Sequence, residues 1–183
     1  NSILFLLVSA TRFYPVIIID MGSLGMSKKT VSNSQVIMHE LVLPNETNVH
    51  GNIFGGKVMY YMDMCAAMSA YKHTRKPVVT ASVDRLNFLA PAKMGDIIIL
   101  KSSVNYTSKS SMEVGVRIDS ENPLTGEVKH TASAYLTFVA LGENKKPTAV
   151  DPIITESEDD IRRYNSGKER SEIRKSRLKE MSR

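Results

Sequence analysis

One long helical pattern runs from Phe54 to about His73 and limits how the rest of the chain can fold. Gly55 and Gly56 open the pattern, no proline interrupts it, and Pro77 lies just beyond its end, as helix start and stop signals require. The rest of the body of the chain shows only strand patterns. A helix flanked by strands must bury its apolar side against a sheet, which predicts an α+β domain.

Five strand patterns accompany the helix, one before it and four after it. The clearest is the alternation of apolar and polar residues from Met112 to Asp119, which predicts a half-buried strand. The alternation falters near Asp84 and Arg85, where we expect a β-bulge. This order of elements predicts an antiparallel β-sheet wrapped around one long central helix. The predicted strands cover residues 36–43, 78–88, 97–107, 112–118 and 128–138.

Composition supports a single domain and narrows the function classes. A chain of 183 residues is long enough for one full-sized domain and too short for two. Cys65 is the single cysteine, so no intramolecular disulfide can form, and the four histidines are scattered rather than grouped like metal ligands. A reducing, cytoplasmic compartment fits this composition. The net charge of +5 and the pI near 9.3 suit an anionic ligand without demanding a nucleic-acid partner.

The two ends of the chain differ from its body. We expect residues 1–33 to be an N-terminal extension outside the fold, residues 34–150 to form the folded domain, and residues 151–183 to be a charged tail, helical or partly disordered. Apolar runs near the N-terminus fall short of the roughly 20 residues that span a bilayer, so no membrane segment is expected. These runs fit an upstream extension or cloning artefact, with an extra strand or a degraded targeting segment as alternatives. The alternative for the tail is a basic lid that contacts ligand phosphates.

Asp63 is the only charged residue between Lys57 and Lys72, in the middle of the predicted helix. Aspartate is a poor mid-helix residue, and burying a carboxylate without partners is costly. The residues one turn away are small or apolar, so another backbone can approach this face closely. A carboxylate in such surroundings suits a general base or a nucleophile. The alternative is a structural aspartate bonded to a backbone group or to a partner chain.

The start of the helix is the second candidate feature, because the run from His50 to Gly56 brings a glycine pair to the first turn. Glycines there expose unpaired backbone N–H groups, and the helix dipole adds positive potential. Such a terminus can hold the oxyanion that develops during acyl transfer. The alternative is that Gly55 and Gly56 only permit tight packing of the helix against the sheet.

The spacing of these two features constrains how they can act together. If the helix begins near Gly55, Asp63 lies about eight residues further on, or roughly 12 Å along the axis. That separation is too large for both groups of one chain to act on a single carbonyl. They converge only when a second copy packs its helix antiparallel and places its own Asp63 beside Asn52 and Gly56. The spacing therefore predicts a composite site across a two-fold interface.

Four short motifs follow one another along the chain. They are residues 50–56 (His-Gly-Asn-Ile-Phe-Gly-Gly), 62–63 (Met-Asp), 79–84 with 87–88, and 109–113 (Lys-Ser-Ser-Met-Glu). In this order and spacing the chain resembles the acyl-CoA thioesterases of the brain-type and bacterial YciA-like group, over about residues 36–142. The resemblance implies a hotdog fold, in which an antiparallel sheet wraps one long helix. It also implies hotdogs paired into dimers, assembled as a trimer of dimers (a homohexamer).

The resemblance implies hydrolysis of acyl-CoA to a free fatty acid and CoA, at a site shared between subunits. An asparagine and an aspartate of the family act there together, and they map onto Asn52 and Asp63. Asp63 activates water or attacks the thioester carbonyl, Asn52 orients the water or the thioester, and the Gly56 amide polarises the carbonyl oxygen. No cofactor is expected beyond the CoA of the substrate, and no metal, nucleic acid or membrane partner.

The resemblance also implies where the CoA lies. We expect its pantetheine arm along the strand 79–88, while the basic and hydroxyl groups of the hairpin near residue 110 suit its phosphates. A solvated turn is the alternative for that hairpin. The predicted substrate-binding and CoA-binding residues are Phe54, Gly55, Thr80, Asn87, Phe88, Lys109, Ser110 and Ser111.

Two other functions are open to a hotdog domain. One is a non-catalytic acyl-CoA-binding sensor or regulator, which would usually carry a DNA-binding module. The residues before position 36 are too few and too apolar for a helix-turn-helix. The other is a hydratase that acts on a double bond of the acyl chain. Such an enzyme would need a catalytic histidine at the helix, and His50 is the only nearby candidate. The presence of both Asp63 and Asn52 favours hydrolysis.

Overall fold

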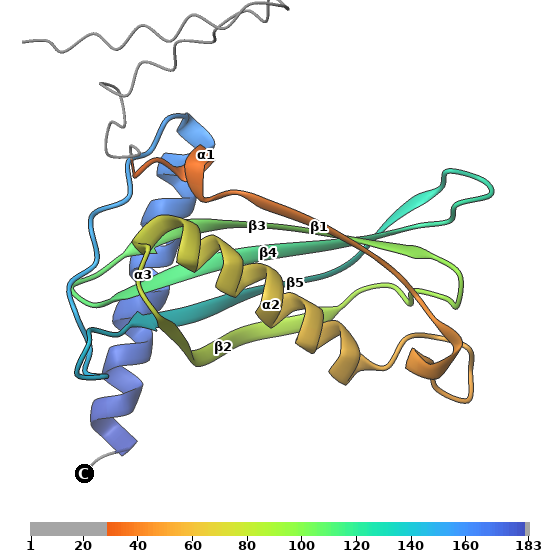
Figure 1. Ribbon diagram of the computed structural model, residues 1–183, viewed down its shortest axis with the longest axis horizontal. Helices are drawn as coiled ribbons and strands as arrows, with labels where there is room; N and C mark the ends of the chain where they lie inside the picture. Colours follow the sequence, from red (N-terminus) through yellow and green to blue (C-terminus); the bar gives the residue numbers. More distant parts are fainter. Residues whose placement is uncertain (1–28, 182–183) are drawn as a thin grey trace, which may run out of the picture.

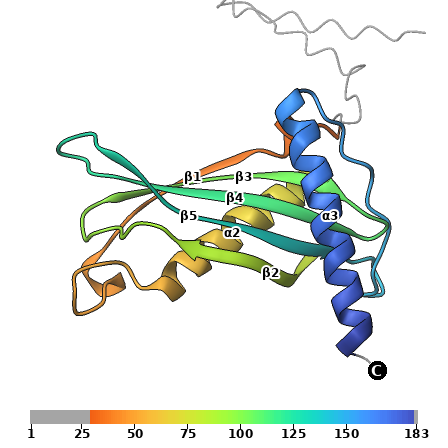
Figure 2. The same ribbon diagram turned by 180° about the vertical axis from the view of Figure 1, so that it is seen from behind.

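The computed structural model describes residues 29–181, in which two long helices lie on opposite faces of one antiparallel sheet (Figure 1, Figure 2). The long helices are α2 (Gly55–Thr74) and α3 (Glu158–Met181). Two short ones, α1 (Val31–Ser34) and the 3-10 turn η2 (Pro44–Glu46), precede α2. The strands are β1 (Val36–Leu41), β2 (Val78–Phe88), β3 (Ile97–Thr107), β4 (Ser111–Glu121) and β5 (Val128–Ala140).

The sheet has the strand order β1-β3-β4-β5-β2, and every neighbouring pair is antiparallel. The predicted α+β fold, an antiparallel sheet wrapped around one long helix, is therefore confirmed. The expected β-bulge is present too, because the register of β2 against β5 shifts between Asp84 and Asn87. β1 ends at Leu41, before the predicted end at residue 43, because Val42 turns into the core and Pro44 begins η2.

One face of α2 packs on the inner face of the sheet. Small polar residues let the helix approach β3 closely, since the hydroxyl of Ser69 lies 2.6 Å from that of Ser102, which also donates to the carbonyl of Cys65 at 2.9 Å. Each large apolar side chain buried here stabilises the fold by about 1.5–3 kcal/mol. The buried residues of α2 recur at helical spacing and are Val58, Tyr61, Met62, Cys65, Ala66, Ser69, Ala70, His73 and Thr74.

The other long helix, α3, crosses the outer face of the sheet and docks through a narrow stripe of residues (Figure 2). Tyr164 packs edge-on against Tyr106 of β3, with ring centroids 5.2 Å apart. Gly167 allows the close approach, because a Cβ there would lie 2.9 Å from the Cβ of Tyr106. One turn further on, Arg170 binds Glu113 of β4 through two hydrogen bonds, at 2.7 and 3.0 Å. This part of the charged tail is therefore a helix. Tyr164, Gly167 and Arg170, which recur every three residues, hold it against the sheet.

The packed part of the chain reaches beyond the predicted domain limits at positions 34 and 150. Val31 is buried in the core, and the ring of His73, near the end of α2, bonds the carbonyl of Asp151 at 2.9 Å. The expectations for residues 1–28 lie outside the described residues. Within residues 29–181, no helix combines the length and the apolar character needed to cross a membrane.

Candidate active site

The segment between η2 and α2 is a tight loop that brings two asparagines to the start of the helix. A bridge between Thr47 and Ile53 holds its ends together. Inside the loop, the amide of Asn48 donates to the carbonyl of Asn52 at 2.8 Å, and the amide of Gly51 donates to the carbonyl of Asn48 at 2.9 Å. Gly51 has a φ of +73°, a left-handed conformation that favours glycine. These bonds fix the loop in one conformation beside α2.

Asn48 also holds the loop through its side chain. Its Oδ1 accepts hydrogen bonds from the amides of His50 at 2.9 Å and Asn52 at 3.3 Å. This is the side-chain turn that asparagine forms with the backbone two residues on. Asn48 was not among the predicted site residues, because it lies just outside the motif that begins at His50. The signal that could have found it is an asparagine shortly before a glycine in a polar loop.

The start of α2 offers backbone N–H groups to a ligand. Phe54 is the N-cap, its side chain makes no capping bond, and its carbonyl accepts the first helical hydrogen bonds. The amides of Gly55 and Gly56 therefore precede the hydrogen-bond ladder of the helix. A Cβ on Gly56 would meet no atom within 4 Å, whereas one on Gly55 would lie 3.4 Å from the ring of Phe88. Gly55 therefore permits tight packing on β2, while the space beside Gly56 is open.

A cleft of about 390 Å³ lies beside the start of α2. Three of the predicted site residues, Asn52, Gly55 and Phe88, meet in its wall. Phe54 and Asn87, next to them in the sequence, are exposed. A mostly apolar cleft beside unpaired amides can take an acyl group with its thioester at the polar end. Its lining residues are Asn52, Ile53, Gly55, Val58, Phe88, Leu89, Ala90, Pro91, Ala92 and Thr131.

Asp63 lies further along α2, beside β2. The carboxylate is half-buried, and its Oδ1 accepts a 2.7 Å hydrogen bond from the hydroxyl of Thr80. The structure thus brings Thr80, predicted as a CoA-binding residue, to the carboxylate. At about 1.5 Å per residue, Asp63 lies roughly 12 Å along the helix from Gly55. One chain therefore keeps the carboxylate and the helix start apart, as the sequence spacing suggested.

The hairpin between β3 and β4, with the predicted nucleotide-binding residues, lies at the other end of the sheet (Figure 1). The carbonyl of Ser110 accepts a 3.0 Å hydrogen bond from the amide of Ala140, the last residue of β5. Ala140 pairs with Val78 at the start of β2, whereas the cleft lies at the end of β2. One chain therefore does not bring this hairpin to its own cleft. The three predicted residues are Lys109, Ser110 and Ser111.

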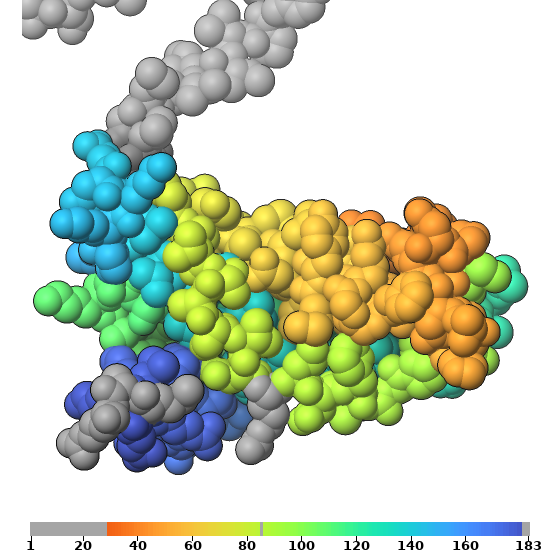
Figure 3. Space-filling model, turned by 90° about the horizontal axis from the view of Figure 1, so that it is seen from below, coloured from red at the N-terminus to blue at the C-terminus, as the bar shows by residue number. Residues whose placement is uncertain are grey.

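The side of α2 that faces away from the sheet is apolar, and in the single chain it lies open beside β2 (Figure 3). β2 is an edge strand, and its residues Val79 and Val83 are exposed. An open strand edge next to an apolar helix face is a surface that a second copy can cover. The large exposed side chains of α2, each 38% to 53% exposed, are Met59, Tyr60, Met64, Met68 and Tyr71.

Cys65, the single thiol, belongs to the core rather than to the candidate site. Its Sγ lies 3.2 Å from the hydroxyl of Ser102, and burial raises the pKa of the thiol. A raised pKa keeps the sulfur protonated and unreactive near neutral pH. Over the described stretch from residue 29 to residue 181, no three His, Cys, Asp or Glu side chains lie together as metal ligands would.

Sequence comparison places the chain among known thioesterases. Residues 50–127 match the family model of the thioesterase superfamily. The chain is 42% identical, over 144 residues, to the uncharacterized acyl-CoA thioester hydrolase YkhA of Bacillus subtilis, and the match covers 79% of this chain and 84% of that one. It is 36% identical, over 149 residues, to the cytosolic acyl coenzyme A thioester hydrolase of Rattus norvegicus. That match covers 80% of this chain but only 39% of the rat protein.

Solved structures agree with the fold described above. The apo form of a hexameric acyl-CoA thioesterase superposes with a TM-score of 0.78 at 44% identity, over 81% of this chain and 96% of that one. An acyl-CoA hydrolase from Staphylococcus aureus, solved with butyryl coenzyme A and coenzyme A, superposes with a TM-score of 0.78 at 38% identity, over 84% and 93% of the two chains. The predicted resemblance is confirmed. The chain therefore belongs to the acyl-CoA thioester hydrolase family of the thioesterase superfamily, and its fold is the hotdog fold of that family.

Proposed function

We propose that this protein hydrolyses acyl-CoA to a fatty acid and CoA, with Asp63 as the general base or nucleophile. The observation that carries the proposal is the Asp63 carboxylate, oriented by the hydroxyl of Thr80 and the only charge on α2 between Lys57 and Lys72. The Staphylococcus aureus relative, solved in complex with butyryl coenzyme A, supports the substrate class. CoA enters as part of the substrate, and the proposed chemistry uses no further cofactor.

The hydrogen bond from Thr80 fixes one oxygen of Asp63 and leaves the other for the reaction. In the general-base route, that oxygen takes a proton from water while the water oxygen adds to the thioester carbonyl. In the nucleophilic route, it adds to the carbonyl itself and forms an anhydride that water then opens. In both routes the C–S bond breaks and the CoA sulfur leaves, taking up a proton. The Gly56 amide at the start of α2 holds the carbonyl oxygen as it becomes negative.

The proposed site combines two subunits. The roughly 12 Å between carboxylate and helix start in one chain is too far for a shared carbonyl, so Asp63 of one subunit works with Gly56 of its partner. The open apolar side of α2 and the open edge of β2 support a two-fold contact there. A relative of known structure is hexameric. The proposed assembly is accordingly a trimer of hotdog dimers.

An asparagine of the loop completes the proposed site, and the spacing in a relative favours Asn48 over the predicted Asn52. The Staphylococcus aureus hydrolase has been solved as variants in which alanine replaces one aspartate, one threonine and one asparagine. There the threonine lies seventeen residues after the aspartate, and the asparagine lies fifteen residues before it. The same spacings lead from Asp63 to Thr80 and to Asn48. Asn52, which lines the cleft, is the alternative for this role.

Replacing each asparagine in turn separates these two candidates. Asn48→Asp keeps the Oδ1 that holds the loop but loses the side-chain N–H donor, so we expect thiol release from acyl-CoA to fall about 10²- to 10³-fold. Asn52→Ala keeps the backbone bonds of the loop, and we expect a change of less than about tenfold. Turnover that survives Asn48→Asp but not Asn52→Ala would reverse the assignment.

The remaining proposals concern the nucleotide end of CoA and the compartment. Because one chain keeps Lys109, Ser110 and Ser111 away from its own cleft, these residues would meet the CoA phosphates from a neighbouring subunit. A cytoplasmic location is proposed, since the rat relative is named cytosolic. Thiol release from a panel of acyl-CoAs tests the function itself. Tight binding of acyl-CoA without thiol release at any chain length would favour a sensor or regulator instead.

A further inference from the structure

A buried carboxylate, Glu46, lies at the entry to the loop that carries Asn48, and it is only 8% exposed. Its Oε1 accepts a 2.7 Å hydrogen bond from the hydroxyl of Tyr61 and lies 3.0 Å from the Nζ of Lys57. Both of these partners belong to the first two turns of α2. The Oε2 of Glu46 accepts a longer bond, at 3.5 Å, from the amide of Leu43. We call the three side chains of Glu46, Lys57 and Tyr61 the Glu46 clamp.

The charges of the Glu46 clamp stabilise one another. Burial is the strongest influence and would raise the pKa of Glu46, but hydrogen bonds from its three neighbours outweigh burial and lower the pKa. The bond to Glu46 raises the pKa of Lys57, and burial together with Glu46 raises the pKa of Tyr61. Near neutral pH the clamp is therefore a carboxylate, an ammonium and a neutral phenol. The ammonium also lies 4.8 Å from the ring centroids of Tyr60 and Tyr61, which ties it to the helix surface.

Glu46 also closes the loop through its backbone. Its carbonyl accepts a 2.9 Å hydrogen bond from the amide of Phe54, the N-cap of α2. This bond closes the loop that carries Asn48, because it joins the residue where the loop begins, Glu46, to the residue where it ends at the start of α2, Phe54. The side chain of Glu46 fixes the same loop to the first two turns of α2, through Lys57 and Tyr61. Backbone and side chain together set where the loop lies relative to the Gly56 amide.

We propose that Glu46 is a positioning residue for thioester hydrolysis, which holds the Asn48 loop against α2 through Lys57 and Tyr61 without touching the substrate. This inference rests on the proposed function. A shift of about 1 Å in a reacting group can cost on the order of 10² in rate, so a loosened loop lowers turnover while the fold persists. The effect falls on kcat rather than KM, because the clamp lies apart from the residues that line the cleft.

Removing each part of the Glu46 clamp tests the inference. We expect Glu46→Gln, Tyr61→Phe and Lys57→Met each to lower kcat for acyl-CoA hydrolysis about tenfold, with KM changed less than about twofold. Lys57→Arg keeps a cation for Glu46, so its kcat should return to near the wild-type value. If Glu46 acts through the loop, Glu46→Gln should have little further effect in a chain that already carries Asn48→Asp.

Glu113→Gln is the matched control, because Glu113 is also a buried carboxylate with a cationic partner, Arg170, but it lies under α3 on the far face of the sheet. This variant should lower stability and leave kcat unchanged. Equal falls in kcat for Glu46→Gln and Glu113→Gln would overturn the inference, and so would additive effects of Glu46→Gln and Asn48→Asp. Those results would leave the proposed function standing. A wild-type protein that releases no thiol from any acyl-CoA would overturn both together.

Discussion

Asp63→Asn is expected to remove most of the thiol release from acyl-CoA, lowering kcat about 10²- to 10⁴-fold. The amide has the size of the carboxylate, and its oxygen can still accept the hydrogen bond from Thr80 that joins α2 to β2. The variant loses only the group that takes a proton from water or attacks the thioester carbon. Initial rates of thiol release at saturating acyl-CoA measure the effect.

Two controls test whether the loss of turnover comes from the chemical step rather than from a change in assembly or stability. The oligomer size of Asp63→Asn, measured by light scattering, should equal that of the wild type. Its midpoint of unfolding should also be close to the wild-type value, because the contact with Thr80 is preserved. Wild-type turnover in Asp63→Asn would contradict the role of Asp63. Loss of turnover accompanied by dissociation of the oligomer would point to a structural aspartate at the subunit interface.

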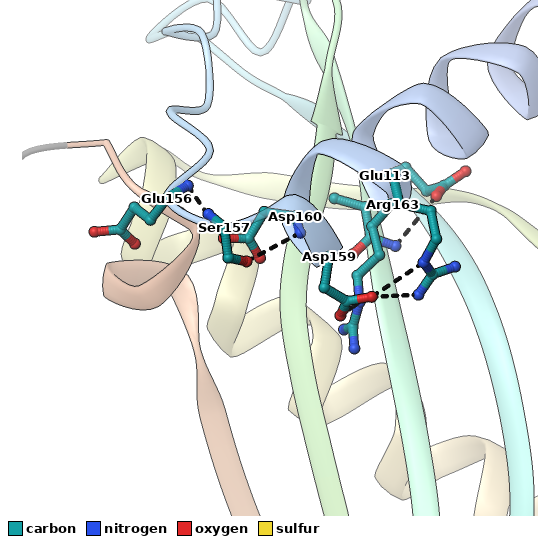
Figure 4. A network of polar contacts seen from close by, with 8 residues as sticks. Glu113, Glu156, Ser157, Asp159, Asp160 and Arg163 are labelled. Atoms are coloured by element: carbon teal, nitrogen blue, oxygen red, sulfur yellow. Dashed lines mark hydrogen bonds and ion pairs between the residues drawn. The ribbon is translucent and has the colours of Figure 1, made fainter.

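Arg170→Ala has the largest expected effect on stability, a loss of about 3–5 kcal/mol in the free energy of unfolding. The guanidinium binds both oxygens of Glu113, which is 1% exposed and lies beside α3 (Figure 4). It also lies 3.6 Å from the ring centroid of Tyr135. Removing it leaves a charged carboxylate buried between α3 and the sheet without its counter-charge. Equilibrium unfolding in urea measures the change.

Arg162→Ala is the matched control for that experiment. Arg162 pairs with Asp159 at 2.5 Å, and Asp159 lies on the exposed first turn of α3 (Figure 4). An ion pair at such an exposed position contributes about 0–1 kcal/mol. Replacing both partners of the buried pair, as Glu113→Leu with Arg170→Met, should cost much less than Arg170→Ala, because no unpaired charge remains. Similar losses from Arg170→Ala and Arg162→Ala would show that the buried pair does not anchor α3.

The central helix and the strands could be predicted because their patterns are local. Apolar spacing marks α2 and the strands, and broken alternation marks the bulge near Asp84. The docking of α3 could not be predicted in the same way, since its charged sequence resembles a solvated tail. Tyr164, Gly167 and Arg170 hold it in place, and each needs a partner on β3 or β4 that only the folded sheet brings near.

Part of the candidate site could be predicted, because some of its residues depart from the sequence pattern around them. Asp63 is the single charge in an apolar helical run, and the glycine pair marks the helix start. The bond from Thr80 to Asp63 depends on how β2 lies beside α2, which no local spacing reveals. Glu46 and Asn48 lie in a polar loop where such residues are ordinary. The role proposed for Glu46 rests on the contacts that fold the loop onto the helix, and the role proposed for Asn48 rests also on the residue spacing in the Staphylococcus aureus relative.

Mixing two inactive variants tests the shared site most directly. Subunits with Asp63→Asn and subunits with Asn48→Asp are produced together under different affinity tags, and the mixed oligomers are isolated through both tags. If each site takes its aspartate from one subunit and its asparagine from the partner, one of the two sites in every mixed dimer carries neither substitution. We predict that such oligomers release thiol from acyl-CoA at up to about half the wild-type rate, while each variant alone stays near background. Thiol release that remains at the level of the two parents would contradict a site shared between subunits.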